Sequence, residues 1–191
     1  MEKIIAAIAE LHPLSEKSRR EFSKIMEIQH VKKKTTIAEL GKVPTHFYIL
    51  TSGIVRSYIT DEKGKEFIRS IYTPMRSVGA FSALIKQTPS TIVYDCLTDC
   101  ELISCDFSKF KKLALKNIDL AVLYSKALER VFVRMEKRII DLSTLDGKQR
   151  YLKLKQRIPE IEKLIPQYHI ASYLNITPVQ LSRIRKELYK T

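Results

Sequence analysis

The hydrophobic and polar positions of the chain follow two different patterns. Between Gly41 and Ser104, short apolar and β-branched runs alternate with turn-forming residues, at 46–51, 54–60, 66–72, 92–97 and 101–105. Four of the five glycines lie in this stretch, where β-turns need them. Many short strands at this spacing are typical of a small antiparallel barrel or jelly roll. We therefore predict such a barrel here, interrupted by one short helix at 80–85.

Helical periodicity predicts the segments on either side of the barrel. Residues 2–11 and 15–28 carry an apolar face at helical spacing, and 31–38 resembles a strand that begins with a run of lysines. After the barrel, Asp106 should cap a helix, and a long helix should run from about 119 to 145. Gly147 is expected to end that helix.

The long helix carries two apolar stripes. One stripe follows the alternating spacing of four and three that is typical of a coiled coil, through Tyr124, Leu128, Val131, Met135, Arg138, Leu142 and Leu145. The other should face the chain's own core, through Leu123, Ala127, Phe132, Ile139 and Ile140. Two stripes favour a homodimer with Tyr124, Leu128, Val131, Met135 and Leu142 at its interface. A single wide stripe in a monomer is the alternative.

The last 25 residues before the terminus predict two short helices joined by a turn at Asn175. Thr177 can cap the second helix, and Gln180 can complete a capping box. The opposite faces of this helix are apolar and basic, which fits a helix-turn-helix whose second helix enters a DNA major groove. Candidate DNA contacts are Gln167, Thr177, Val179, Gln180, Ser182, Arg183 and Lys186.

Within that set, Arg183 can pair with a guanine edge, whereas Lys186 is expected to contact phosphate. Lys153 and Lys155, outside the hairpin, are also predicted phosphate contacts. A helical hairpin that only covers a core is the alternative, because motifs of this kind have many false matches.

Charge strengthens the DNA hypothesis. The chain has a net charge of +13, and residues 126–191 carry 15 basic but only 7 acidic side chains. This excess favours a polyanionic partner, nucleic acid before membrane. The opening residues lack a secretory pattern, and no apolar run reaches membrane-spanning length. Three cysteines in strand-like sequence are typical of free thiols, so we expect a cytoplasmic protein.

Candidate catalytic and metal-binding groups are sparse. The four histidines are scattered, at His12, His30, His46 and His169. No metal-ligand cluster, Gly-rich phosphate loop or nucleophile–base pair stands out. We therefore predict no enzyme, no metal and no cofactor. The stronger rival to a DNA-binding regulator is a small-ligand-binding regulatory module without direct DNA binding.

A barrel, a long helix and a terminal helix-turn-helix, in this order, resemble the Crp/Fnr family of bacterial transcription regulators. Three stretches carry the resemblance: GKVPTHFYILTSGIVRSYITDEKGKE, DCELISCDFSKFKKL and IASYLNITPVQLSRIRKEL. It implies an α+β protein with a cyclic-nucleotide-binding-like barrel at 1–116, a dimerisation helix at 117–146 and a helix-turn-helix domain at 147–191. It further implies a palindromic DNA operator, transcription regulation by the dimer, and RNA polymerase as an additional partner.

The sequence departs from the family pattern at the effector site and beyond the long helix. Family members that bind cyclic nucleotides place Gly-Glu and Arg-Ser or Arg-Thr where this chain has Gly79-Ala80 and Ser90-Thr91. Losing the arginine leaves a buried phosphate without its charge-assisted partner. We expect no response to cyclic AMP, and another small effector or none in a pocket formed by Gly79, Ala80, Phe81, Ser90 and Thr91.

Two further family features are not expected. The stretch after 147 is too short for β-hairpin wings and predicts an all-helical reader. No cysteine precedes Cys96, so the N-terminal iron–sulfur cluster of oxygen-sensing members is not supported.

Overall fold

The computed structural model describes residues 8 and 10–189, so most of the helix predicted at 2–11 lies outside the described residues. The strands form two four-stranded antiparallel sheets, ordered β1-β8-β3-β6 and β2-β7-β4-β5. Their bounds are β1 Met26–Val31, β2 Thr36–Ala38, β3 His46–Ser52, β4 Val55–Thr60, β5 Glu66–Tyr72, β6 Arg76–Val78, β7 Val93–Cys96 and β8 Cys100–Asp106. The predicted antiparallel β-core is confirmed.

Large apolar side chains fill the space between the two sheets. Leu50, Val55 and Leu102 are fully buried there, and the Tyr94 ring packs 6.0 Å from that of Tyr72. The alternation of buried and exposed positions along β3 and β7 produces this interior, because successive side chains of a strand point to opposite faces. β8 is buried over most of its length, since it pairs with both β1 and β3.

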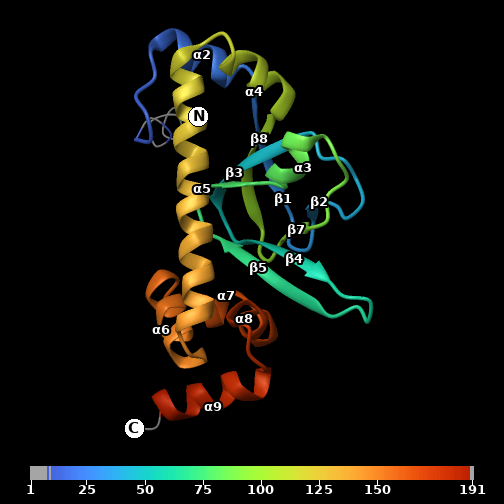
Figure 1. Ribbon diagram of the computed structural model, residues 1–191, viewed down its shortest axis with the longest axis vertical. Coiled ribbons are helices and arrows are strands. Elements are labelled where there is room, and N and C mark those ends of the chain that lie inside the picture. The colour runs from blue at the N-terminus through green and yellow to red at the C-terminus, as the bar shows by residue number, and fades with distance from the viewer. Residues whose placement is uncertain (1–7, 9, 190–191) are drawn as a thin grey trace.

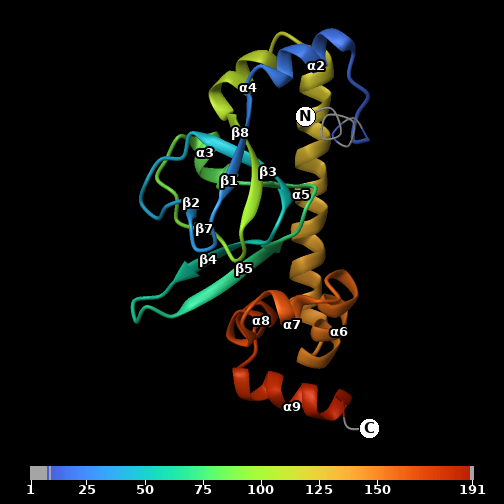
Figure 2. The same ribbon diagram turned by 180° about the vertical axis from the view of Figure 1, so that it is seen from behind.

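Helices surround the sheets and make up the described chain after β8 (Figure 1). The long α5 (Ile118–Thr144) runs beside the barrel, with α2 (Glu16–Ser23) and α4 (Phe107–Ala114) at one end. The short α3 (Phe81–Lys86) follows β6. The reverse view in Figure 2 shows the remaining helices gathered at the far end of α5: α6 (Gly147–Arg157), α7 (Ile161–Leu164), α8 (Gln167–Leu174) and α9 (Pro178–Tyr189).

Two predicted elements before the barrel core have different bounds in the structure. The helix predicted at 15–28 ends at Ser23, and Met26–Val31 instead pairs with β8 as β1. The strand predicted at 31–38 is broken by the lysine run, where Lys34 has a φ of 72° in a turn. Pairing with a buried central strand outweighs the local helical pattern, since tertiary context routinely overrides intrinsic propensity. The short β6 was not predicted at all.

The orientation of α5 differs from the prediction for the stripe that was expected to face the core. Leu123 is buried as expected, but Phe132, Ile139 and Ile140 are 66%, 63% and 53% exposed. Tyr124 instead packs against the chain's own α4, with its ring 5.6 Å from that of Phe110. Leu120 and Leu123, in the first half of α5, are buried, whereas the apolar side chains from Phe132 onward are exposed. The apolar stripe therefore does not stay on the inner side along the whole helix.

Gly147 begins a helix, contrary to the prediction that it ends one. Asp146 caps α6, accepting from the Gln149 amide at 2.7 Å, while the Gln149 side chain accepts from the Asp146 amide at 3.0 Å. A Cβ on Gly147 would lie 2.9 Å from Cγ2 of Ile176. Glycine therefore lets the start of α6 approach the turn of the terminal hairpin.

Candidate nucleic-acid interface

The terminal hairpin has the local structure that the sequence predicted. Asn175 adopts the left-handed conformation, with φ 53° and ψ 47°, and ends α8. The Thr177 amide donates to Oε1 of Gln180 at 2.8 Å, and the Gln180 amide donates to Oγ1 of Thr177 at 3.1 Å. This reciprocal capping box satisfies two of the free amides at the start of α9.

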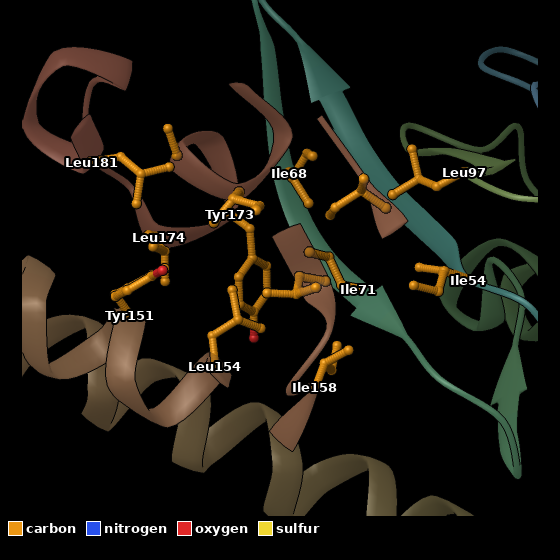
Figure 3. Packing of buried hydrophobic residues seen from close by; sticks show 14 residues of the cluster. Ile54, Ile68, Ile71, Leu97, Tyr151, Leu154, Ile158, Tyr173, Leu174 and Leu181 are labelled. Atoms are coloured by element: carbon orange, nitrogen blue, oxygen red, sulfur yellow. The ribbon is translucent and has the colours of Figure 1, made fainter. Parts of the chain in front are cut away.

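The hairpin is held in place by a core that it shares with the barrel (Figure 3). Leu174 of α8 and Leu181 of α9 are fully buried. The same cluster contains side chains from α6 and from the barrel strands and the adjoining loops, among them Tyr151, Leu154, Ile54, Ile68, Ile71 and Leu97. The terminal helices and the barrel are therefore joined by continuous apolar packing.

Ser172 adds a polar connection to this contact. Its hydroxyl donates to the Glu66 carbonyl at 3.0 Å and accepts from the Ile68 amide at 3.0 Å. Both backbone groups belong to β5, which lies at the edge of its sheet. An edge strand leaves a row of amides and carbonyls unpaired, and α8 supplies partners for two of them.

A buried arginine links three strands to α8. Arg56 of β4 is 5% exposed, and its Nε and Nη2 donate to the two carboxylate oxygens of Asp95 at 2.7 and 2.9 Å. It also pairs with Glu66 of β5 and stacks 4.1 Å from the ring centre of Tyr58. Two carboxylates thus compensate one buried guanidinium. Their charges offset the cost of removing this cation from water.

His169 of α8 completes this group of charges. Its Nδ1 lies 3.0 Å from Nη1 of Arg56. A guanidinium can only donate, so Nδ1 must accept and the imidazole is neutral. Burial, followed by the charge of Arg56, lowers the pKa of His169 to about 4. Sequence reasoning missed this contact because its partners are separated by 113 positions.

The outer face of α9 has the opposite character. Val179 is 60% exposed, and Ser182, Arg183 and Lys186 are also exposed. Spacings of three, four and seven residues put them on one side of the helix, away from the buried Leu181. Within the part of the chain that the structure describes, neither Arg183 nor Lys186 has a carboxylate within 4.0 Å.

Three of the five basic residues of α6 are paired with carboxylates instead. Lys148 pairs with Glu187, Lys153 lies 2.7 Å from Asp141, and Lys155 lies 3.2 Å from Glu162. Arg185 of α9 shares Glu162 at 2.5 Å. The phosphate contacts predicted for Lys153 and Lys155 therefore compete with existing ion pairs.

Two residues at the start of α8 are also exposed. Gln167, a predicted contact, is exposed, and Tyr168 is 58% exposed. Tyr168 was not predicted, although an exposed aromatic residue next to a turn is a sequence signal that could have identified it.

The residues of the predicted effector pocket come from two segments, the start of α3 and the loop before β7. Gly79, Ala80 and Phe81 form the start of α3, and Ala80 is buried. The Ser90 hydroxyl donates to the Ile92 carbonyl at 2.7 Å, and Thr91 is exposed. The interior of the barrel is occupied by Tyr94, whose hydroxyl accepts from Arg69 at 3.3 Å.

The five residues predicted at the dimer interface differ in their surroundings. Leu128 and Val131 line a cavity between α5 and the barrel, as does Tyr124. Met135 and Leu142 are 46% and 37% exposed. Tyr124, Leu128 and Val131 are partly buried, and all five remain predicted dimer contacts.

The described residues meet neither the requirements of a three-ligand metal site nor those of a membrane-spanning helix. No group of three His, Cys, Asp or Glu side chains among residues 8 and 10–189 could hold a metal ion. None of the described helices is long and apolar enough to cross a membrane. Cys96, Cys100 and Cys105 are free and buried.

Residues 28–117 match the family model of the cyclic nucleotide-binding domain. Over 113 residues the chain is 25% identical to the cAMP-activated global transcriptional regulator CRP of Salmonella typhimurium, covering 59% of this chain and 54% of that protein. The chain thus aligns with about half the length of this curated relative.

Solved structures extend the similarity to the terminal helices. FixK2 from Bradyrhizobium japonicum superposes with a TM-score of 0.71 at 17% identity, covering 86% of this chain and 85% of FixK2. A putative transcriptional regulator of the Crp/Fnr family from Eubacterium rectale gives 0.72 at 18% identity, covering 91% of this chain and 83% of that one. Residues 28–117 are therefore similar to a cyclic nucleotide-binding domain, and the chain has the fold of these Crp/Fnr-type structures.

Proposed function

We propose that the chain is a sequence-specific, DNA-binding transcription regulator that acts as a homodimer and inserts α9 into the major groove. The observation that carries this proposal is the outer face of α9, where Arg183 and Lys186 are exposed and without carboxylate partners in the described structure. Exposed cations without carboxylate partners on one helix face, next to an α6 whose three lysines are already paired, form a site for an external polyanion.

The side chains of this face have different proposed roles. Arg183 would pair bidentately with O6 and N7 of a guanine, while Val179 would contact a thymine methyl. Ser182 would read a neighbouring edge, and Lys186 would hold a phosphate. Gln167 lies at the start of α8, where helix amides favour a phosphate.

Thr177 and Gln180 receive a positioning role in this proposal. Each side chain already bonds the other's backbone amide in the capping box. Their effect on DNA would therefore come through the orientation of α9, and not through direct contact with bases.

The proposed dimer face is the exposed apolar side of α5. Phe132 and Ile139 are seven residues apart, as are Val133 and Ile140, and all four are more than half exposed. Apolar positions repeated at seven residues are typical of a helix that pairs with another helix. Met135 and Leu142 lie at its border, and Tyr124, Leu128 and Val131 remain further candidate contacts of the same dimer.

Sedimentation of an Ile139→Glu variant tests this face. A charge inside a helix pair should weaken dimerisation by about 3 kcal/mol, or about 100-fold. Lys63→Glu, exposed in the turn between β4 and β5, is the control and should leave the dimer intact. A native chain that stays monomeric at micromolar concentration would exclude this interface.

Cyclic AMP is not the proposed effector. Ala80 and Ser90 offer neither the carboxylate nor the guanidinium that a cyclic nucleotide needs at these positions, and the Ser90 hydroxyl bonds its own backbone. Calorimetric titration should show no binding at physiological concentrations. A dissociation constant below about 10 μM, or about −7 kcal/mol, would contradict this.

Selection from randomised duplex DNA tests the main proposal. The native chain should enrich palindromic sequences whose half-sites are about 34 Å apart, because two α9 helices in a dimer reach successive major grooves. A chain that binds no duplex preferentially would instead be a ligand-binding module without direct DNA function.

In this proposal, residues 1–116 sense an effector, 117–146 dimerise and 147–191 bind DNA. The core shared by the barrel and α8 supports communication between the first and last of these segments.

A further inference from the structure

A cavity of about 190 Å³ lies between α5 and the barrel. Of the five residues predicted for the effector pocket, only Phe81 lines it. Its walls are mainly apolar and come from several elements, including Phe22, Phe47, Phe81, Phe110, Leu123 and Val131. An apolar cavity of about 150 Å³ is large enough for benzene, so this one has room for one aromatic ring or a short aliphatic chain.

Three arginines also line the cavity. Arg76 comes from β6, and Arg130 and Arg134 come from successive turns of α5. Within the described residues, none of the three has a carboxylate within 4.0 Å, and Glu10 is the single acidic side chain of the lining. Burial, and then the charge of Arg76, lower the pKa of Arg134. Arg134 is only partly exposed, so its charge is incompletely hydrated, and an anion bound beside it would compensate that charge.

The order of residues along α5 fixes the polarity of the cavity. Leu123 lies near the aromatic side chains, while Arg130 and Arg134 follow seven and eleven residues later. At a rise of 1.5 Å per residue, the cationic end lies roughly 10–16 Å from the apolar end. Met75, next to Arg76, is 48% exposed, and Arg130 is exposed too, so the cationic end reaches solvent.

We propose that this cavity binds a small amphipathic carboxylate. A single ring or short chain would fill the apolar end, and the carboxylate would pair with Arg134 and its neighbours Arg76 and Arg130. The guanidinium fork matches the planar, bidentate geometry of a carboxylate, and burial of the apolar body supplies the remaining affinity. The site rests on the cavity and its arginines alone, and it does not depend on DNA binding.

Calorimetric titration of the full chain with octanoate and with 1-octanol tests the proposal. The two probes share an apolar chain and differ in the charged head. Octanoate should bind with a dissociation constant of about 100 μM or below, and 1-octanol at least about tenfold more weakly. Equal binding of both probes, or no octanoate binding at millimolar concentration, would overturn the proposal.

Variants identify the site. Arg134→Gln should weaken octanoate binding about tenfold and leave 1-octanol unchanged. Lys137→Gln removes the same charge from an exposed position of the same helix and should affect neither probe. Ala127→Leu, which adds bulk to the lining, should weaken both. If Ala127→Leu does not fold, Arg134→Gln and its control Lys137→Gln still test the site. Equal octanoate affinity in these two variants would overturn the assignment.

Discussion

The inner face of α8 and the outer face of α9 belong to the same hairpin but use their polar residues differently. On α8, His169 and Ser172 are paired with Arg56 and with the edge of β5. On α9, Arg183 and Lys186 are exposed and have no carboxylate partner in the described chain. Buried polar groups need partners within the fold, whereas exposed cations remain hydrated and available. The availability of partners within the fold, more than residue type, therefore separates the attached face of α8 from the exposed face of α9.

Removing the buried cation should break the attachment most strongly. Arg56→Met leaves Asp95 and Glu66 without their shared partner, which typically costs about 3–5 kcal/mol of unfolding free energy. Arg183→Met, on the exposed face, is the control and should stay within about 0.5 kcal/mol. Urea denaturation measures both. Equal losses in the two variants would contradict the distinction between the faces.

Apolar residues of the two faces should differ in the same way. Leu174→Ala opens a cavity in the shared core and should cost about 2–5 kcal/mol. Val179→Ala, on the exposed side, should change the free energy of unfolding by less than about 0.5 kcal/mol.

Urea unfolding of the native chain should be one transition, since the barrel and the terminal helices share that core. Two separate transitions would show that the shared core does not couple them.

Acid should weaken the attachment through His169. Folded His169 takes up its proton near pH 4, compared with 6.5 for an ordinary histidine. Between these values the unfolded chain binds more protons, so stability is lost as pH falls from about 6.5 to about 4, by up to about 3 kcal/mol. His169→Gln should remove this part of the pH dependence, and His30→Gln, on the exposed β1, should retain it. An unchanged pH profile in His169→Gln would refute the assignment.

Local patterns predicted what depends on neighbouring residues. The capping box of Thr177 and Gln180, the turn at Asn175 and most strand positions follow from chemistry within a few positions of each other. The burial of Leu181 follows from helical spacing in the same way. These features need no knowledge of what packs against them.

Features set by distant partners were not predicted. Periodicity showed two stripes on α5 but could not say which one the barrel covers, so Phe132 was assigned to the inner side although it is exposed. Arg56 and His169 meet only because α8 docks on β5. Gly147 was predicted to end a helix, but glycine is needed there because the backbone approaches Ile176, almost thirty residues away.

The most direct test of the account compares variants on selected and random duplexes. Arg183→Ala should cost about 1–3 kcal/mol on the selected duplex and remove discrimination at one base pair of each half-site. Lys186→Ala should weaken both duplexes alike and reduce the salt slope by about one. Lys155→Ala should alter binding least, because Lys155 is already paired with Glu162. If Arg183→Ala instead lowers the affinity for selected and random duplexes by the same factor, α9 holds DNA by charge and does not read its sequence.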